Sequence, residues 1–139
     1  MGVDAPLVTV KVHLSNGLPA ITYHQVPVSY GKRKQRSCSR CITQFWLPIS
    51  NRRVTTNLAP TDLPKEGGRF DLPIALGILA ATDQLPHESL HGYEFLGELS
   101  LSGQLRSVHG VLPAAVTSGN HSRSIVVPIN NGGEALHAK

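Results

Sequence analysis

Two cysteines are the residues of this sequence whose type and spacing most directly suggest chemistry. Cys38 and Cys41 form a Cys-x-x-Cys pair, the spacing of half a zinc site or of a redox pair. A tetrahedral zinc site needs two more ligands, but a second Cys pair is absent and the His residues are remote in sequence. We therefore expect two free thiols, and the sequence predicts no metal and no other cofactor for this chain.

Three serines close to a histidine offer the other conceivable catalytic group. Ser100, Ser102 and Ser107 precede His109, and a hydrolase needs a hydroxyl within hydrogen-bond reach of such a base. Because Ser and His are often close in sequence without any function, a degenerate hydrolase is kept only as an alternative. No Gly-x-x-x-x-Gly-Lys-Ser/Thr motif occurs, so the sequence contains no phosphate-binding loop for ATP.

Positive charge is concentrated in one part of the chain. The formal net charge is +4, which permits contact with nucleic acid without arguing for it. Segment 31–40 holds basic residues and no acid: Lys32, Arg33, Lys34, Arg36 and Arg40. This run is compatible with a small nucleic-acid-binding module around Cys38 and Cys41, or with a solvated loop.

The candidate side chains must be positioned by the elements around them. A strand, a loop and a helix in the middle of the chain are the central ones. Residues 54–58 are rich in β-forming types and predict a strand, and Pro and Gly residues over 60–68 predict a loop. Asp71 is predicted to be the N-cap of a helix over 72–81, its carboxylate accepting first-turn N–H groups. This helix is apolar almost all round, so we expect it to be buried.

Shorter elements flank this centre. Residues 7–14 alternate like a half-buried strand with His13 outward, and Ser15-Asn16-Gly17 predicts a turn into a return strand over 18–22. The later pattern predicts a strand over 93–101, a turn at Ser102-Gly103, a partner strand over 104–108 and a short buried strand over 124–128. It also predicts a helix over 110–117 that stops at Ser118-Gly119-Asn120, and a helix over 130–139. These elements, in a 139-residue chain that is 40% hydrophobic, predict a single α+β domain. No run is long and apolar enough to span a bilayer and no signal peptide is recognisable, so the expected setting is the cytoplasm.

Three contiguous strings of the sequence resemble a known family. Residues 57–81, 95–106 and 110–115 are similar to the N-terminal domain of the ComM family of competence proteins. This family is also called YifB, the magnesium-chelatase-like AAA+ proteins, and the likeness covers residues 5–19 and 51–136. The family places this domain ahead of an AAA+ ATPase module and a C-terminal domain, and its members carry a strand before Gly2. The resemblance therefore implies a domain that is truncated at both ends.

The family domain is similar in turn to the proteolytic domain of Lon proteases and to the C-terminal domain of the RadA recombination protein. That resemblance implies a mixed β-sheet packed by helices. It also aligns Asp71 with the serine nucleophile of Lon and Leu112 with its lysine. Neither residue can act in a Ser–Lys dyad, so the resemblance implies the fold without the peptidase and no catalytic residue is predicted.

What is known of the family implies an ATP-driven homo-oligomeric ring that remodels branched DNA while incoming DNA is integrated during natural transformation. For this chain it implies a non-catalytic domain that helps to assemble the ring or to hold DNA, with ATP and Mg²⁺ bound by the absent AAA+ module. The candidate DNA contacts are Arg52, Arg53, Lys65 and Arg69. Their alternative interpretation is ordinary surface charge.

The resemblance is lost after Pro19 and returns at Asn51. Family members have an amphipathic helix there. With permitted codons for residues 29–50, a frame shifted by one base encodes AMVKESKDRVRAALLNFGFPF, which has helical periodicity and opposite charges at (i, i+4) spacing. We interpret this segment as the family helix read out of frame, which would remove the case for zinc or redox chemistry at Cys38 and Cys41.

Overall fold

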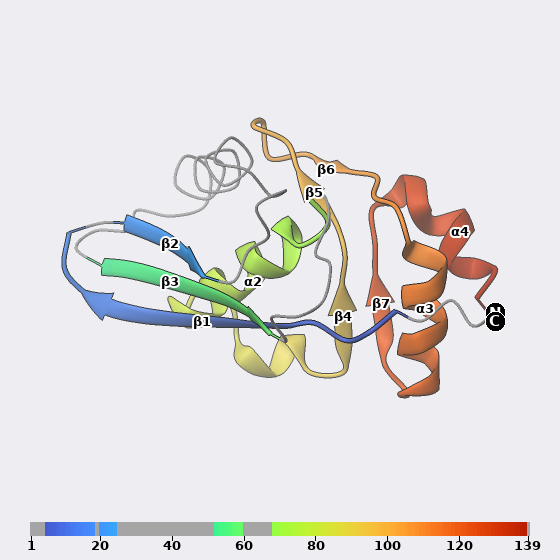
Figure 1. Ribbon diagram of the computed structural model, residues 1–139, viewed down its shortest axis with the longest axis horizontal. Coiled ribbons are helices and arrows are strands. Elements are labelled where there is room, and N and C mark those ends of the chain that lie inside the picture. The colour runs from blue at the N-terminus through green and yellow to red at the C-terminus, as the bar shows by residue number, and fades with distance from the viewer. Residues whose placement is uncertain (1–4, 19, 25–51, 60–67, 139) are drawn as a thin grey trace.

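The first three strands form one sheet in which the last of them lies in the middle. They are β1 (Thr9–Asn16), β2 (Ala20–His24) and β3 (Arg52–Ala59), in a computed structural model that describes residues 5–18, 20–24, 52–59 and 68–138. The strand order is β1-β3-β2, and β3 runs antiparallel to β1 and parallel to β2. This sheet makes up the left-hand end of the molecule in Figure 1.

The predicted hairpin between residues 7–14 and 18–22 is therefore wrong. Both strands exist, but each pairs with β3 and not with the other. Val54, Thr56 and Leu58 of β3 are almost fully buried, so this strand takes the central place, where both of its edges find hydrogen-bond partners. The Asn-Gly turn specifies only a local reversal of the chain and cannot exclude a partner that comes later in the sequence.

The inner face of the sheet packs on helix α2 (Asp71–Ala81), which confirms the predicted strand and buried helix at the centre of the chain. The fully buried aliphatic side chains of this core are Val54, Leu58, Ile74 and Ile78. Burial of each side chain of this size contributes about 1.5–3 kcal/mol. Gly77 allows the close approach of α2 to β1, because a Cβ atom there would lie 2.8 Å from Cγ2 of Val12.

Residues 93–108 form parts of two short sheets instead of the single predicted hairpin. After the 3-10 helix η3 (His87–Leu90), β4 (Tyr93–Phe95) pairs in parallel with β7 (Ser124–Val126), and β5 (Glu98–Leu99) pairs antiparallel with β6 (Leu105–Arg106). The two sheets separate at Gly97, whose N–H donates to the carbonyl oxygen of Arg69. The predicted turn is confirmed at Gly103, which has a φ of 83°.

The start of α2 differs by one residue from the prediction. Phe70 occupies the N-cap position without a side-chain cap, and Asp71 is the first helical residue. Asp71 is 3% exposed, and its Oδ2 accepts a hydrogen bond of 3.1 Å from the N–H of Leu99. The side chain therefore ties α2 to β5, while its charge lies in the first turn, where the helix dipole stabilises an anion.

The C-terminal part contains α3 (Val111–Asn120), the 3-10 helix η4 (Ile129–Asn131) and α4 (Gly132–Leu136). Both predicted helices are confirmed, although α3 runs through the Ser118-Gly119-Asn120 stretch that was predicted to end it. The predicted burial of strand 124–128 is wrong for β7, because Ser124 is exposed and Val126 is 37% exposed. A β-branched pair predicts a strand here, but it does not tell which of its faces is covered.

Figure 1 shows α2 between the β1-β3-β2 sheet and the unit made of β4, β7, α3 and α4. Helices packed on small mixed sheets confirm the α+β class. The likeness to the Lon proteolytic domain stays an expectation. No helix within the described ranges is long and apolar enough to cross a membrane. The predictions for residues 29–50, with Cys38 and Cys41, and for Lys65 fall outside the described residues.

Candidate nucleic-acid interface

Two of the predicted DNA contacts lie at the start of β3. Arg52 and Arg53 are exposed, opposite Asn16 and Ser15 of β1. Successive side chains of a strand point to opposite faces, so the two guanidinium groups diverge. Because Val54 faces α2, Arg53 belongs to the outer face of the sheet.

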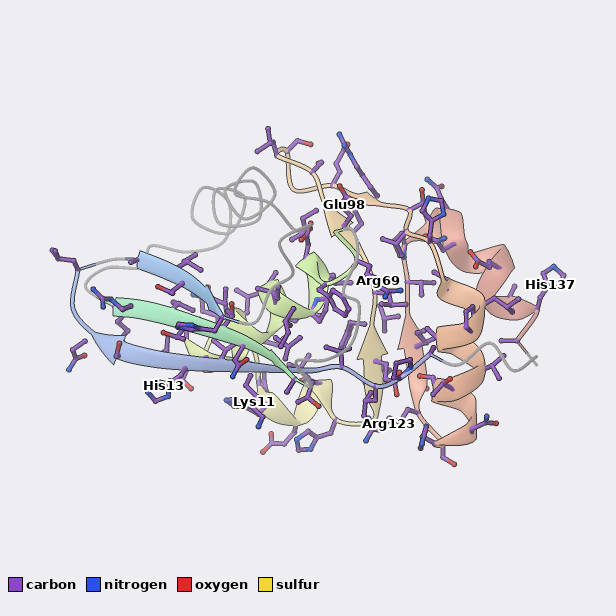
Figure 2. The ribbon with its side chains drawn as sticks, in the orientation of Figure 1. Lys11, His13, Arg69, Glu98, Arg123 and His137 are labelled. Carbon is purple, nitrogen blue, oxygen red and sulfur yellow. The ribbon has the colours of Figure 1, made fainter. Side chains whose placement is uncertain are left out.

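Arg69 lies elsewhere and is packed between two helices. Its guanidinium carbon is 5.2 Å from the ring centroid of Phe70, within the range of a cation–π contact. A Cβ atom on Gly110, at the start of α3, would lie 3.2 Å from its Nη1. Its Nε is buried and finds no hydrogen-bond partner among the described residues. Figure 2 shows Arg69 in the middle of the molecule, well away from the left-hand tip where β3 begins.

The predicted set of four DNA contacts is therefore not a single cluster. Arg52 and Arg53 are neighbours, Arg69 is separate, and Lys65 is outside the described residues. The structure instead places other basic side chains on the same face of the sheet as Arg53. Lys11 and His13 of β1 and His24 of β2 are all exposed and belong to the same outer face.

Part of this cluster was visible in the sequence. The alternation over residues 7–14 places Lys11 and His13 on one face, and Figure 2 shows both side chains leaving β1 in the same direction. Their association with Arg53 and His24 depends on the register of β3 against both neighbours. No sequence pattern indicated that register.

The two positions aligned with the Lon dyad have quite different surroundings. Asp71 is almost completely buried, and its carboxylate holds the backbone N–H of Leu99. Leu112 is 39% exposed on α3, and its N–H donates to Oε1 of Glu134 at 3.0 Å. Glu134 thus satisfies a first-turn N–H of α3, whose own N-cap residue, Gly110, has no side chain to do so.

Two of the three serines near His109, Ser100 and Ser102, stabilise a turn. Ser100 is 7% exposed, its Oγ lies 2.8 Å from Oγ of Ser102, and it accepts a 3.1 Å hydrogen bond from the N–H of Gln104. These contacts close the β5–β6 turn. Within the described ranges no hydrogen bond joins His109 to Ser100, Ser102 or Ser107, so the arrangement does not supply a base to any of these hydroxyls.

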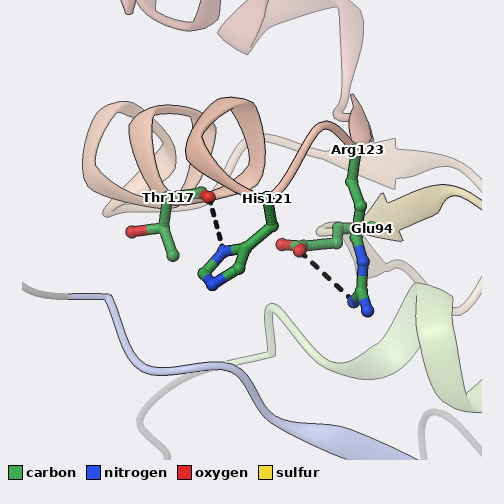
Figure 3. A network of polar contacts seen from close by, with 4 residues as sticks. All are labelled: Glu94, Thr117, His121 and Arg123. Atoms are coloured by element: carbon green, nitrogen blue, oxygen red, sulfur yellow. Dashed lines mark hydrogen bonds and ion pairs between the residues drawn. The ribbon is translucent and has the colours of Figure 1, made fainter.

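A further polar cluster joins the end of α3 to β4 (Figure 3). Nδ1 of His121 donates to the carbonyl oxygen of Thr117 at 2.8 Å, and Nη1 of Arg123 lies 3.7 Å from Oε1 of Glu94. Both contacts fix the connection that leads from α3 into β7. Across the described part of the chain, no three His, Cys, Asp or Glu side chains are grouped so that they could hold a metal ion.

Comparison with known proteins shows which family this chain belongs to. The family described as "Subunit ChlI of Mg-chelatase" matches residues 10–131, from β1 to the end of η4. The chain belongs to this family. The matched region contains the sheet, α2, α3 and the outer-face residues Lys11, His13, His24 and Arg53.

Several relatives of this ChlI-family chain are similar over nearly all of its length. Competence protein ComM of Haemophilus influenzae is 50% identical over 135 residues, which cover 97% of this chain and 26% of that protein. The uncharacterised protein YifB of Salmonella typhimurium is 42% identical over 134 residues, or 96% of this chain and 26% of the relative. An uncharacterised protein of Mycobacterium tuberculosis is 32% identical over 135 residues, 96% of this chain and 27% of its own length. The ChlI-family chain thus spans about a quarter of the length of the curated relatives that it matches. The resemblance to the ComM and YifB family predicted from its sequence is confirmed.

Proposed function

We propose that this chain is a non-catalytic N-terminal domain of a ComM-type, magnesium-chelatase-like AAA+ ATPase that acts on DNA during natural transformation. The observation that carries the proposal is the 50% identity to a protein named for competence, across 97% of this chain. In this proposal the AAA+ module of the parent protein binds ATP and Mg²⁺ and assembles into a homo-oligomeric ring in the cytoplasm. The domain described here holds DNA or helps the ring to assemble.

The side chains of the chain support a non-catalytic role. The sequence has no phosphate-binding loop, and phosphoryl transfer requires one that positions the phosphates and the metal ion. Asp71 and Ser100 are both used in holding backbone N–H groups. The alternatives, a degenerate hydrolase and a small basic or metal-binding module, have no comparable support in the described residues.

A chimera tests the role in competence. The matching region of the Haemophilus influenzae ComM protein is replaced by this chain, and natural transformation is measured beside a strain that lacks the region. We expect the chimera to restore transformation and the deletion to abolish it. A second chimera carries the frame-shifted string in place of residues 29–50, as a control for damage in that segment. If both chimeras accumulate normally and transform no better than the deletion, the proposed function is wrong.

A biochemical assay tests the non-catalytic role separately. The purified chain is incubated with ATP and with an unstructured protein substrate, and we expect neither to be consumed. Turnover that a single substitution in this chain abolishes would contradict the assignment.

A further inference from the structure

The outer face of the β1-β3-β2 sheet has an unusual distribution of charge. Register places its side chains in rows across the three strands. Lys11 lies opposite Asn57, which lies opposite His24, and the next row joins His13 to Thr55 and Thr22. Arg53 stands in the third row, beside Ser15 and Ala20. Every described row therefore offers a basic group, a hydroxyl or an amide.

Within the three described strands, no acid balances these groups. The three strands contain three Lys or Arg residues, namely Lys11, Arg52 and Arg53, and no Asp or Glu, a formal charge of +3. The rest of the described chain contains three arginines, Arg69, Arg106 and Arg123, against six acids, Asp71, Asp83, Glu88, Glu94, Glu98 and Glu134, a formal charge of −3. The described part of the molecule is thus electrically polarised, with its positive end on the sheet.

We propose that the outer face of this sheet binds the phosphate backbone of nucleic acid, with Lys11 and Arg53 as its principal phosphate contacts. The choice of nucleic acid as the bound polyanion rests on the proposed function. The positive charge of the face follows from the sequence and the strand register alone. Lys and Arg that neutralise phosphates release counterions, and hydroxyl and amide donors such as Thr55 and Asn57 add hydrogen bonds to phosphate oxygens. His13 and His24 contribute further donors at the two edges of the face.

The composition of the face also indicates how it binds. Its described side chains include no Phe, Tyr or Trp, so these side chains offer no platform on which bases could stack. Recognition through phosphates carries no sequence information. The face therefore binds single strands and duplexes of any base composition, as a contact that holds DNA while another part of the protein acts on it.

The polarised charge sets the orientation of approach. DNA is attracted to the positive sheet and repelled by the negative remainder of the described chain, which carries α3 and α4. Arg69, packed on Phe70 between the helices, takes no part in this surface. The proposed face therefore changes the set of DNA contacts predicted from sequence. Of the described residues in that set, only Arg53 belongs to the face.

The test uses the complete 139-residue chain and fluorescein-labelled DNA of random sequence, as duplex and as single strand, with binding followed by anisotropy. Affinity is measured between about 50 and 200 mM salt. The variant Lys11→Gln/Arg53→Gln is compared with Arg106→Gln/Arg123→Gln, which removes the same charge from exposed positions elsewhere. Circular dichroism of each variant verifies the fold.

We expect the chain to bind both DNA forms, and the Lys11→Gln/Arg53→Gln variant to lose affinity for both. Its plot of log K against log salt concentration should become shallower by about 2, one for each lost phosphate contact. The Arg106→Gln/Arg123→Gln variant should bind like the parent. An equal loss in both variants, an unchanged Lys11→Gln/Arg53→Gln variant, or no binding by the parent chain would overturn the proposal. Displacement of DNA by polyglutamate at matched charge would also overturn it, in favour of an acidic protein segment.

The two proposals fail in distinguishable ways. If the chimera restores transformation but DNA binding does not change in the Lys11→Gln/Arg53→Gln variant, the proposed function is supported and the DNA-binding face is wrong. If DNA binding depends on Lys11 and Arg53 but the chimera is inactive, the DNA-binding face is supported and the proposed function is wrong.

Discussion

The side chain of Asn131 pairs with the backbone of Val108 on both of its hydrogen-bonding sides. Oδ1 of Asn131 accepts from the Val108 N–H at 3.0 Å, and Nδ2 donates to the Val108 carbonyl oxygen at 2.9 Å. Nδ2 also lies 3.3 Å from Oε2 of Glu134. Asn131 is 6% exposed, and its single amide group supplies the backbone of Val108, in the loop before α3, with both hydrogen-bond partners that a neighbouring strand would supply.

Replacement of Asn131 should therefore destabilise the fold. Asn131→Ala leaves the N–H and the carbonyl of Val108 without their partner, and each buried unsatisfied group costs about 1–3 kcal/mol. We expect a loss of roughly 2–4 kcal/mol in the free energy of unfolding, measured by urea denaturation. The neighbouring exposed residue gives a control, since Asn130→Ala should change stability by less than about 0.5 kcal/mol. Equal midpoints for the two variants would contradict this role.

Asp71 should behave as a structural carboxylate. Asp71→Ala removes the acceptor of the buried Leu99 N–H and should cost about 1–3 kcal/mol, whereas Asp71→Asn keeps an acceptor oxygen and should cost less. Thermal melting of both variants, with the exposed Glu88→Ala as control, measures the difference. A melting temperature of Asp71→Ala equal to that of the parent would exclude the structural role and leave a functional carboxylate.

Two glycines in helices should respond in opposite directions to the same substitution. Gly77→Ala places a Cβ 2.8 Å from Val12 Cγ2, and overpacking of this kind costs about 1–3 kcal/mol against a gain of up to about 1 kcal/mol in helix propensity. Gly119→Ala on α3 meets no atom within 4 Å, so it should stabilise by about 0.5–1 kcal/mol. A denaturation midpoint of Gly77→Ala that rises with that of Gly119→Ala would show that the α2–β1 packing has room for the added methyl group.

The frame hypothesis for residues 29–50 makes a prediction about the gene. Its nucleotide sequence should contain a frame that opens by a one-base shift near Ser29, encodes an amphipathic helix and closes near Asn51. Sequencing of the DNA determines this directly. If no single-base shift yields such a frame, Cys38 and Cys41 regain their interest, and zinc binding with counted thiols becomes the experiment to perform.

Local patterns predicted local elements well. The apolar run after Asp71 predicted α2, and the alternation over residues 7–14 predicted β1 with His13 outward. The cap was displaced to Phe70, because a side chain able to cap does not by itself fix where a helix begins. The helix over 110–117 was predicted, but its end was not, since residues that can stop a helix are tolerated inside one.

Pairing between distant segments could not be predicted. The position of β3 between β1 and β2 depends on the burial of Val54 and Leu58 against α2, which no short window of sequence contains. For the same reason the candidate contacts chosen by charge alone included the half-buried Arg69, which packs on Phe70, and omitted Lys11. A charged residue becomes part of a surface through the register of its strand, and the register is a property of the whole sheet.

The central place of β3 also has a consequence for synthesis of the chain. β1 and β2 emerge from the ribosome before any of β3 exists, and residues 25–51 separate β2 from the strand that both must pair with. At a synthesis rate of roughly 5–20 residues per second, the first two strands wait for seconds with their hydrogen-bonding edges open. During that interval they are exposed to pairing with other chains, so chaperones that bind extended segments should be needed most while residues 25–59 are being translated.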